Sequence, residues 1–436
     1  MRRVLFISPH FPPDSAAGTH RARLLAPRLA EHGWEPIVLT VDPSGYEGPL
    51  DSALAESVPS TLRVVRAHAW PARLTRTLGV GDLGLRAFQG LWREATQLVA
   101  REPLDAVFVT IYPTYPGLLG PLLKRRFNLP FALDYQDPWV GEWGRSVGGG
   151  NGSATDAKSR ASRWLAMRLE PIALRAADAV TAVSTATYVQ ALERHRLAEP
   201  RASAELPIGW DERDVAFLRT RARRSPPLFS SDDGLVHVVY VGTLLPTGLD
   251  TLRAVCAAWS RWRSRNAAAA GRLRMHFIGT SNQRSGGAPR VLPIAREFDI
   301  AGFIAEHPDR LDYFDALQAL DDADAVLLLG SSEPHYTPSK LYPAMASGRP
   351  MLAIYHAAST ATSLLARFGR APAVRLVTYD EASPVGAHVD EIATELSELV
   401  RAPRYDAGDV DRRALDEVST PALAARLAGV LARIAR

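Results

Sequence analysis

Short apolar runs alternate with amphipathic stretches along almost the whole chain, and this alternation strongly limits the folds open to it. In the first half, strands are expected at 4–8, 36–41, 62–66, 106–110, 131–134 and 179–183. A second series is expected at 236–241, 275–278, 302–305, 325–329, 351–355 and 374–378. Strands that alternate with helices form parallel sheets covered on both faces. The sequence therefore predicts an α/β protein with two such sheets.

The length of the chain also favours two domains. At 436 residues it exceeds one ordinary core, and two domains of roughly 200 residues are expected. The segment 212–234 is rich in Arg, Pro, Ser and Asp without clear periodicity, so we expect it to be the linker. This gives a first domain at 1–211 and a second at 235–411, with a C-terminal helix at 412–436 packing back on the first.

Composition narrows the class of protein. An apolar content of 47% and a charged content of 22% are normal for a folded soluble protein. No apolar run is long enough to span a membrane, and the one after Met1 is too short for a signal peptide. The lone Cys256 excludes an internal disulfide and fits a reducing compartment. We therefore expect a cytoplasmic protein.

The net positive charge of the chain indicates which kinds of partner it can bind. The pI of about 9.3 comes from scattered arginines, which favours anionic small molecules or an anionic membrane surface over nucleic acid. The stretch 85–100 combines two arginines with apolar residues at helical spacing: Arg86, Arg93, Leu85, Phe88, Trp92 and Val99. This pattern predicts weak peripheral binding at the inner face of the cytoplasmic membrane. The same pattern also describes a helix packed on the sheet.

The segment 338–350 carries the strongest chemical signal. It follows the apolar run 325–329 and reads as a loop and a helix that ends at Gly348. A helix N-terminus at the carboxyl end of a parallel strand suits phosphate. Lys340 would add a positive charge there, and it is one of only three lysines against 48 arginines. The segment therefore predicts a phosphate site.

Pro-Ser-Lys at 338–340 resembles the donor motif Pro-Ser-Lys-x-x-Glu of family 4 glycosyltransferases. The pattern Phe-Pro-Pro-x-x-x-Ala-Gly-x-x-Arg at 11–21 resembles the opening of that family, and the segments 176–184, 206–211 and 239–252 resemble later landmarks. The resemblance implies the GT-B fold, two Rossmann-like domains facing each other across a cleft. It also implies a retaining, metal-independent transfer from a nucleotide-sugar, which is a substrate, so no cofactor is expected.

The resemblance carries over to particular residues. It implies that Gly18, between the first strand and the first helix, faces the donor phosphates or sugar, although an ordinary turn there explains the same small residues. The further donor-binding residues it implies are Thr243, His335, Ser339, Lys340 and Leu341. Additional candidates are Glu333, Arg21 and Thr110.

A carboxylate follows the strand expected at 131–134. The sequence Asp-Tyr-Gln-Asp-Pro-Trp at 134–139 is similar to the Arg-Asp-x-Trp segment of the branch that includes capsule, O-antigen and colanic-acid transferases. Catalytic groups gather at such strand ends. Asp137 is therefore the candidate catalytic residue, contacting hydroxyls of the acceptor or the sugar. Alternatively, Asp137 caps the following turn and Trp139 belongs to the core.

Several donor positions depart from the family pattern. The glutamate that holds the ribose is Pro343 here, and the basic residues that grip the diphosphate are Thr243 and Thr247. Two alternatives therefore stay open: a catalytically silent GT-B binding protein or partner subunit, and a sugar-nucleotide epimerase. The acceptor of the preferred glycosyltransferase would be a glycan, a lipid-linked molecule or a small molecule. No metal site is predicted, because the histidines are dispersed and Asp322-Ala323-Asp324 adjoins a core strand.

Overall fold

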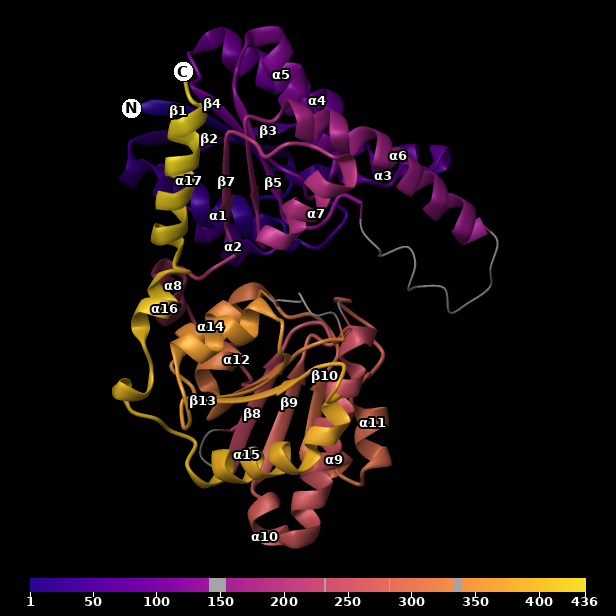
Figure 1. Ribbon diagram of the computed structural model, residues 1–436, viewed down its shortest axis with the longest axis vertical. Helices are drawn as coiled ribbons and strands as arrows, with labels where there is room; N and C mark the ends of the chain where they lie inside the picture. The colour runs from indigo at the N-terminus through magenta and orange to yellow at the C-terminus, as the bar shows by residue number, and fades with distance from the viewer. Residues whose placement is uncertain (141–153, 231–232, 282, 333–338) are drawn as a thin grey trace. The chain divides into compact units, whose positions relative to one another are not determined.

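The computed structural model describes residues 1–140, 154–230, 233–281, 283–332 and 339–436. The chain forms two compact units (Figure 1). The first comprises Met1–Asp211 together with Thr420–Arg436, and the second comprises Glu212–Ser419. None of the described helices is long and apolar enough to cross a membrane.

The first unit is built on a seven-stranded parallel sheet in the order β3-β2-β1-β4-β5-β6-β7. Its strands are β1 (Arg2–Ile7), β2 (Trp34–Val41), β3 (Arg63–Ala67), β4 (Ala106–Thr110), β5 (Phe131–Tyr135), β6 (Ala179–Ala182) and β7 (Ala202–Glu205). The chain order reverses between β1 and β4. Loops at the carboxyl ends of these two strands diverge, which is where open α/β sheets bind ligands.

Helices cover both faces of this sheet. One face packs against α4 (Leu83–Arg101), α5 (Leu119–Phe127), α6 (Ala154–Ala176) and α7 (Thr185–His195). The other packs against α1 (Thr19–Arg28) and the C-terminal helix α17 (Thr420–Ile434). The backbone N–H of Thr420 donates to the carbonyl of Trp210 at 2.8 Å, so α17 begins beside the end of the first unit's other segment. Short helices α2 (Ser52–Glu56) and α3 (Ala72–Thr75) lie between β2 and α4.

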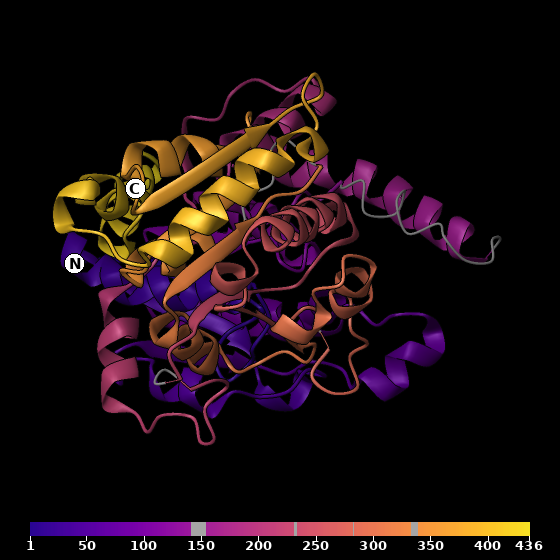
Figure 2. The ribbon, with the colours of Figure 1, turned by 90° about the horizontal axis from the view of Figure 1, so that it is seen from below.

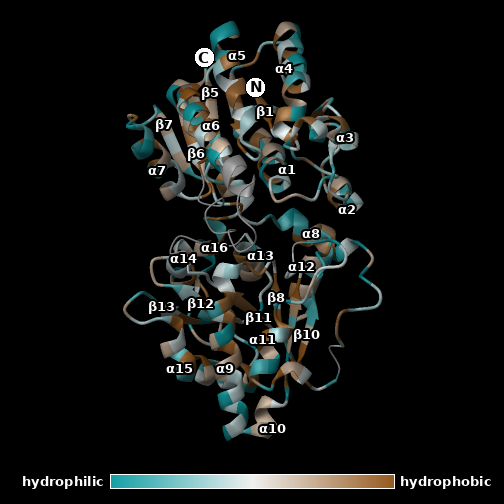
Figure 3. Ribbon diagram, turned by 90° about the vertical axis from the view of Figure 1, so that its right-hand side faces the viewer, coloured by the Kyte–Doolittle hydropathy of each residue, from teal (hydrophilic) through white to brown (hydrophobic). Residues whose placement is uncertain are grey.

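The second unit has a six-stranded parallel sheet in the order β10-β9-β8-β11-β12-β13. Its strands are β8 (Val236–Val241), β9 (Leu273–Ile278), β10 (Ile304–His307), β11 (Ala325–Leu329), β12 (Met351–His356) and β13 (Val374–Tyr379). Its main helices are α8 (Glu212–Thr220), α9 (Leu249–Arg265), α10 (Ala267–Ala270), α11 (Leu292–Glu297), α12 (Tyr313–Asp322), α13 (Leu341–Ala346), α14 (Thr360–Phe368), α15 (Val389–Arg401) and α16 (Arg412–Asp416). Hydrophobic residues follow the strands in the middle of each unit (Figure 3).

The expected α/β class with two Rossmann-like domains is confirmed. Two expected boundaries differ from the observed units. The segment 212–234, expected as a linker, opens with α8 inside the second unit, because Tyr313 donates to Asp214 at 2.9 Å and Arg221 pairs with Asp315 at 2.8 Å. At the C-terminus, α16 belongs to the second unit and only the chain from Thr420 onward belongs to the first.

Candidate functional site

A pocket of about 400 Å³ opens at the carboxyl end of the first unit's sheet. Loops after β1, β4 and β5 contribute to it, together with the start of α4. Its lining combines one imidazole and two carboxyl groups with an aromatic ring and apolar side chains: His10, Asp82, Leu83, Ile111, Tyr112, Pro113, Thr114 and Asp137. The pocket lies at the reversal of strand order, the position expected for a ligand site.

His10 is held by a chain of hydrogen bonds. Its Nδ1 pairs with the carboxylate of Asp14, which is buried in the loop after β1. The same carboxylate accepts from the hydroxyl of Thr19 at 3.3 Å. Because Nδ1 is engaged with Asp14, Nε2 is the ring nitrogen that can hydrogen-bond a ligand. His10 is therefore a positioned polar group in the pocket wall.

The two carboxyl groups of the pocket have shifted acidities. Burial raises the pKa of Asp82, although its backbone hydrogen bonds from Leu85 and Gly84 and the charge of His10 act in the opposite direction. Desolvation by neighbouring protein atoms also raises the pKa of Asp137, even though part of its surface remains exposed. Among the described residues, Asp137 has no hydrogen-bond or ion-pair partner. Its carboxylate is thus available to a ligand, whereas Trp139 belongs to the core, as the alternative expected. The catalytic role of Asp137 stays a prediction.

Gly18 has a packing role beside this pocket. A Cβ atom at position 18 would lie 2.3 Å from Cδ1 of Tyr112, far inside contact distance. Tyr112 in turn lies against His10, with the ring centroids 5.4 Å apart. The absence of a side chain at Gly18 therefore lets Tyr112 form the pocket wall. The expected contact between Gly18 and donor phosphates stays a prediction.

Two further sequence candidates lie in the core. Arg21 is 1% exposed and pairs with the buried Asp134 at 3.0 Å, while also donating to the carbonyl of Pro207 at 3.2 Å. Thr110 is fully buried and its hydroxyl donates to Ser8 at 3.4 Å. In the structure, these side chains tie β5, β4 and β1 to α1 and the loop before Asp211. A donor contact of Arg21 or Thr110 stays a prediction.

In the second unit, the structure brings two predicted donor segments together. Gly242 follows β8 with φ of 143°, and a Cβ there would lie 3.9 Å from Cγ of Lys340. Thr243 is next in the chain, and its carbonyl accepts from Tyr240 at 3.1 Å. Strands β8 and β11 are neighbours, and the sheet's chain order reverses between them. Lys340 and the Gly242-Thr243 turn thus lie together at the carboxyl ends of β8 and β11, where the strand order of the second sheet reverses.

Lys340 has an aromatic neighbour. Its Nζ lies 4.8 Å from the ring centroid of Tyr313, within range of a cation–π interaction. The hydroxyl of Tyr313 donates to Asp214 at 2.9 Å, which orients the ring. Beside the same turn, Arg290 donates to the carbonyl of Leu244 at 2.6 Å. Two basic side chains therefore lie near the loop after β8, and Arg290 had no counterpart among the sequence candidates.

The other residues of the predicted donor motif differ in how accessible they are to a ligand. Ser339 is exposed, whereas the side chain of Leu341 is fully buried, so Leu341 could offer a ligand only its backbone. Helix α13 has six residues and contains Pro343 near its start, which limits the phosphate-binding helix N-terminus expected there. Glu333 and His335 lie outside the described residues.

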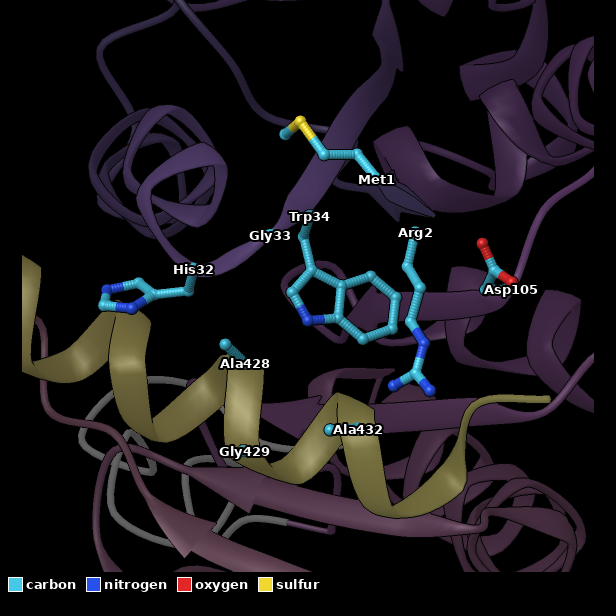
Figure 4. A pocket seen from close by; sticks show the side chains of 9 residues that line it. All are labelled: Met1, Arg2, His32, Gly33, Trp34, Asp105, Ala428, Gly429 and Ala432. Carbon is cyan, nitrogen blue, oxygen red and sulfur yellow. The ribbon is translucent and has the colours of Figure 1, made fainter.

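A larger hollow of about 740 Å³ lies elsewhere on the first unit (Figure 4). It is formed where α17 crosses the amino ends of β1 and β2. The guanidinium carbon of Arg2 lies 5.9 Å from the ring centroid of Trp34, and Asp105 accepts from the backbone of Arg3 at 2.6 Å. Arg2 and Asp105 are thus engaged within the chain, and the hollow lies at the opposite sheet edge from the carboxyl ends where α/β sheets place ligands.

Sequence reasoning missed His10 and Asp82. His10 occupies the same strand-to-helix turn as Gly18, which was a usable signal. Asp82 reads as a helix cap, and its carboxylate does accept from the backbone of Leu85 at 2.9 Å. In the described part of the chain, no group of three His, Cys, Asp or Glu residues could hold a metal ion. Metal independence stays a prediction.

Residues 17–209 match the family model described as the glycosyl transferase 4-like domain. The match covers most of the first unit and less than half of the chain, and it supports a glycosyltransferase domain there. No curated protein matches the sequence.

Solved structures similar to the whole chain share its fold. A glycosyltransferase from Rickettsia africae is 12% identical, with 99% of this chain and 98% of that chain covered and a TM-score of 0.56. An α,α-trehalose 6-phosphate synthase from Burkholderia multivorans is 13% identical, with 99% and 98% covered and a TM-score of 0.59. A UDP-forming α,α-trehalose-phosphate synthase from Burkholderia vietnamiensis is 14% identical, with 99% and 97% covered and a TM-score of 0.55. The shared architecture is the GT-B fold of two Rossmann-like domains.

Proposed function

We propose that this protein transfers a sugar from a nucleotide-sugar to an acceptor hydroxyl, with retention of configuration and without a metal ion. The observation that carries the proposal is the placement of Lys340 against the Gly242-Thr243 turn at the reversal point of the second sheet. The glycosyl transferase 4-like match of the first unit supports the same reaction class. A UDP-forming synthase among the fold neighbours is consistent with a nucleotide-sugar donor.

The second unit would hold the donor diphosphate. Gly242 has no side chain and a positive φ, so phosphate oxygens can approach the backbone of this turn. Lys340 supplies a positive charge that stabilises the leaving diphosphate as charge develops on it. In the retaining scheme that the family resemblance implies, a donor phosphate oxygen takes the proton of the acceptor hydroxyl. The anomeric carbon of the sugar then bonds to the acceptor oxygen on the face from which the diphosphate departs, while its bond to the phosphate oxygen breaks.

The first unit would hold the acceptor. Hydroxyl groups of a sugar both donate and accept hydrogen bonds, and the pocket offers partners for each. The carboxylate of Asp137 can accept, Nε2 of His10 can accept or donate, and Asp82 adds a second carboxyl group. The ring of Tyr112 and the side chain of Leu83 supply an apolar surface for the C–H groups of the same molecule. This mixture suits a glycan or glycoside better than a purely ionic acceptor.

Titration calorimetry against UDP-, GDP- and TDP-sugars, followed by an assay for sugar release and transfer, tests the proposal. Binding of at least one nucleotide-sugar with slow hydrolysis or transfer is expected. An absence of binding across the panel would remove the donor site from the second unit.

A non-catalytic binding role is the second candidate, and the residues at the donor turn favour it. In the family that the chain resembles, two basic residues hold the donor diphosphate and a glutamate holds the ribose. This chain has Thr243, Thr247 and Pro343 at those positions. Nucleotide-sugar binding without turnover, with every acceptor class offered, would select this role.

A further inference from the structure

Helix α6 carries an exposed stripe that the proposed reaction does not use. Within the first unit, its N-terminal half projects beyond the helices that cover the sheet (Figure 2). Three large apolar side chains are open to solvent on it, with Trp164 60%, Met167 36% and Ile172 53% exposed. Their spacing of three, five and eight residues places them on one side of a helix.

Arginines share this stripe. Exposed arginines at the same helical spacing interleave with the apolar residues, so that the stripe comprises Arg160, Trp164, Met167, Arg168, Ile172 and Arg175. The guanidinium carbon of Arg168 lies 5.1 Å from the ring centroid of Trp164, so the two side chains lie against each other. The arrangement combines basic charge with an interfacial aromatic residue on one helical face.

The stripe has no exposed acidic residue. The one acidic residue between 160 and 176 is Glu170, which is fully buried on the opposite side of the helix. Its carboxylate accepts from Arg194 at 2.9 Å and pairs with His195 at 2.7 Å. The adjoining helix α5 adds exposed Leu122, Arg125 and Arg126. Among the residues described here, the exposed charges of the stripe and of the adjoining end of α5 are therefore positive.

The stretch 85–100, expected to contact a membrane, does not offer such a surface. Phe88, Trp92 and Val99 pack against the core on the sheet side of α4, and Arg86 is 3% exposed and donates to the carbonyl of Gly45 at 2.9 Å. The alternative of a helix packed on the sheet is thus the observed one for α4.

We propose that the α6 stripe, with the adjoining end of α5, is a docking surface for an anionic lipid bilayer. Tryptophan and arginine together suit the headgroup region, where the ring is partly buried and the guanidinium pairs with lipid phosphate. Three arginines on one helix face attract a negatively charged surface and bind a neutral one weakly. This surface is independent of the donor and acceptor sites, so its test needs neither substrate.

Co-sedimentation of the full chain tests the proposal, with vesicles of phosphatidylcholine alone and of phosphatidylcholine mixed with phosphatidylglycerol. We expect binding to the anionic vesicles that falls as salt is raised. The double variant Arg168→Gln/Arg175→Gln should bind at least tenfold more weakly, from about fivefold per arginine. The variant Trp164→Ser/Ile172→Ser should also lose binding. The control Arg412→Gln/Arg413→Gln removes equal charge from exposed positions of the second unit and should bind as the parent does.

A fluorescent label locates the contact directly. Because the lone Cys256 is buried, an environment-sensitive dye can be placed selectively on an Ala161→Cys variant beside the stripe. Its emission should shift to the blue on anionic vesicles, while a label on an Arg413→Cys variant should not shift.

Four results would overturn the proposal: no binding of the parent protein, equal binding to neutral vesicles, stripe variants that bind like the parent, or a shift confined to the label at 413. Self-association that the same stripe variants abolish, without vesicle binding, would assign the face to a second copy of the chain. All variants should melt with the parent, because the substituted side chains are exposed.

Discussion

At the scale of single residues, Lys340 has the most specific expected role. It lies over Tyr313 and beside Gly242, and none of these contacts holds the sheet together. We predict that Lys340→Ala lowers nucleotide-sugar affinity at least tenfold, because one charge-assisted hydrogen bond to phosphate contributes roughly 1.5–3 kcal/mol. The melting temperature should stay within a few degrees. Titration and scanning calorimetry on the variant measure the affinity and the melting temperature, and Arg413→Ala is the control of equal charge change. Unchanged affinity would show that Lys340 is only a surface charge.

Asp137 links function to stability. The folded protein raises the pKa of this carboxyl above its ordinary value of 3.8, so folding disfavours its ionised form at neutral pH. Removing the charge should therefore stabilise the fold. We predict that Asp137→Asn melts higher than the parent at pH 7, and that the gain shrinks as the pH falls toward 3.8, where the parent's carboxyl is itself protonated.

The same variant should lose activity. If Asp137 accepts a hydrogen bond from a substrate hydroxyl, its replacement should lower kcat/KM about 10- to 100-fold. Thermal scans from pH 4 to 8 and initial rates on one preparation test both parts. A variant that is more stable at every pH and fully active would place Asp137 outside the site.

Gly18 can be tested through its neighbour. Because a Cβ at position 18 would meet the Tyr112 ring at 2.3 Å, Gly18→Ala should destabilise the first unit by about 1–3 kcal/mol. The double variant Gly18→Ala/Tyr112→Ala removes the clash and should recover part of that loss relative to Tyr112→Ala alone. Urea unfolding of the four proteins in this cycle gives the coupling free energy. Additive effects would show that the ring has room to move.

At the scale of elements, two histidines connect neighbouring strands of the second sheet. His237 on β8 hydrogen-bonds His276 on β9 at 2.9 Å, and the ring of Phe229 lies over both, with centroids 4.9 and 4.4 Å away. Burial lowers the pKa of His276 to about 4, with smaller effects from His237 and His307. The segment before β8 therefore covers a buried imidazole pair in which His276 is held neutral at pH 7.

This pair predicts acid sensitivity of the second unit. A lowered pKa means that the unfolded chain binds the proton more readily, so stability is lost as the pH falls from 6.5 toward about 4. The full loss would be roughly 3 kcal/mol for a shift of about 2.5. A His276→Phe variant should show a flatter pH profile of urea unfolding, whereas a change at the exposed His32 should not alter it. Parallel pH profiles for the parent, the His276→Phe variant and the His32 variant would show that His276 is not the source of the acid sensitivity.

The elements also show what the sequence could and could not predict. Strands β1, β4, β5 and β11 are buried on both faces and appear as continuous apolar runs, so they were recognised. β7 was missed because its residues include Ser203 and Glu205 on an edge strand. β10 begins two residues later than expected, because 301–303 form a 3₁₀ turn.

The candidate site could be predicted only in part, because some of its residues directly follow strands and others are brought there by helix packing. Gly18 and Asp137 follow strands directly, and the loops after parallel strands are known to converge at one sheet edge. Asp82 instead comes from the start of α4, and only the packing of α4 on the sheet brings it to His10. Arg21 and Thr110 follow the same local pattern as functional residues, yet their side chains turn into the core. Local sequence identifies the edge of the sheet but not which side chains point outward there.

At the scale of the whole molecule, the chain leaves the first unit at Asp211 and returns to it at Thr420. Helix α17 then covers one face of the first sheet with side chains that are at most 4% exposed, namely Leu423, Leu427, Val430, Leu431 and Ile434. Burying each such side chain contributes roughly 1.5–3 kcal/mol. Together they are comparable to the roughly 5–15 kcal/mol by which a typical domain is stable.

We therefore predict that a chain ending at Ser419 loses the first unit and keeps the second. The second unit is continuous from Glu212 to Ser419 and has its own core, so it does not depend on α17 for its packing. Calorimetry of the truncated chain should show one unfolding transition in place of two, and limited proteolysis should leave a fragment close to 212–419. Nucleotide-sugar binding should survive in that fragment, because Lys340 and the Gly242-Thr243 turn both belong to it, whereas transfer should be lost. Retention of both transitions after truncation would show that the remaining helices suffice to cover the first sheet.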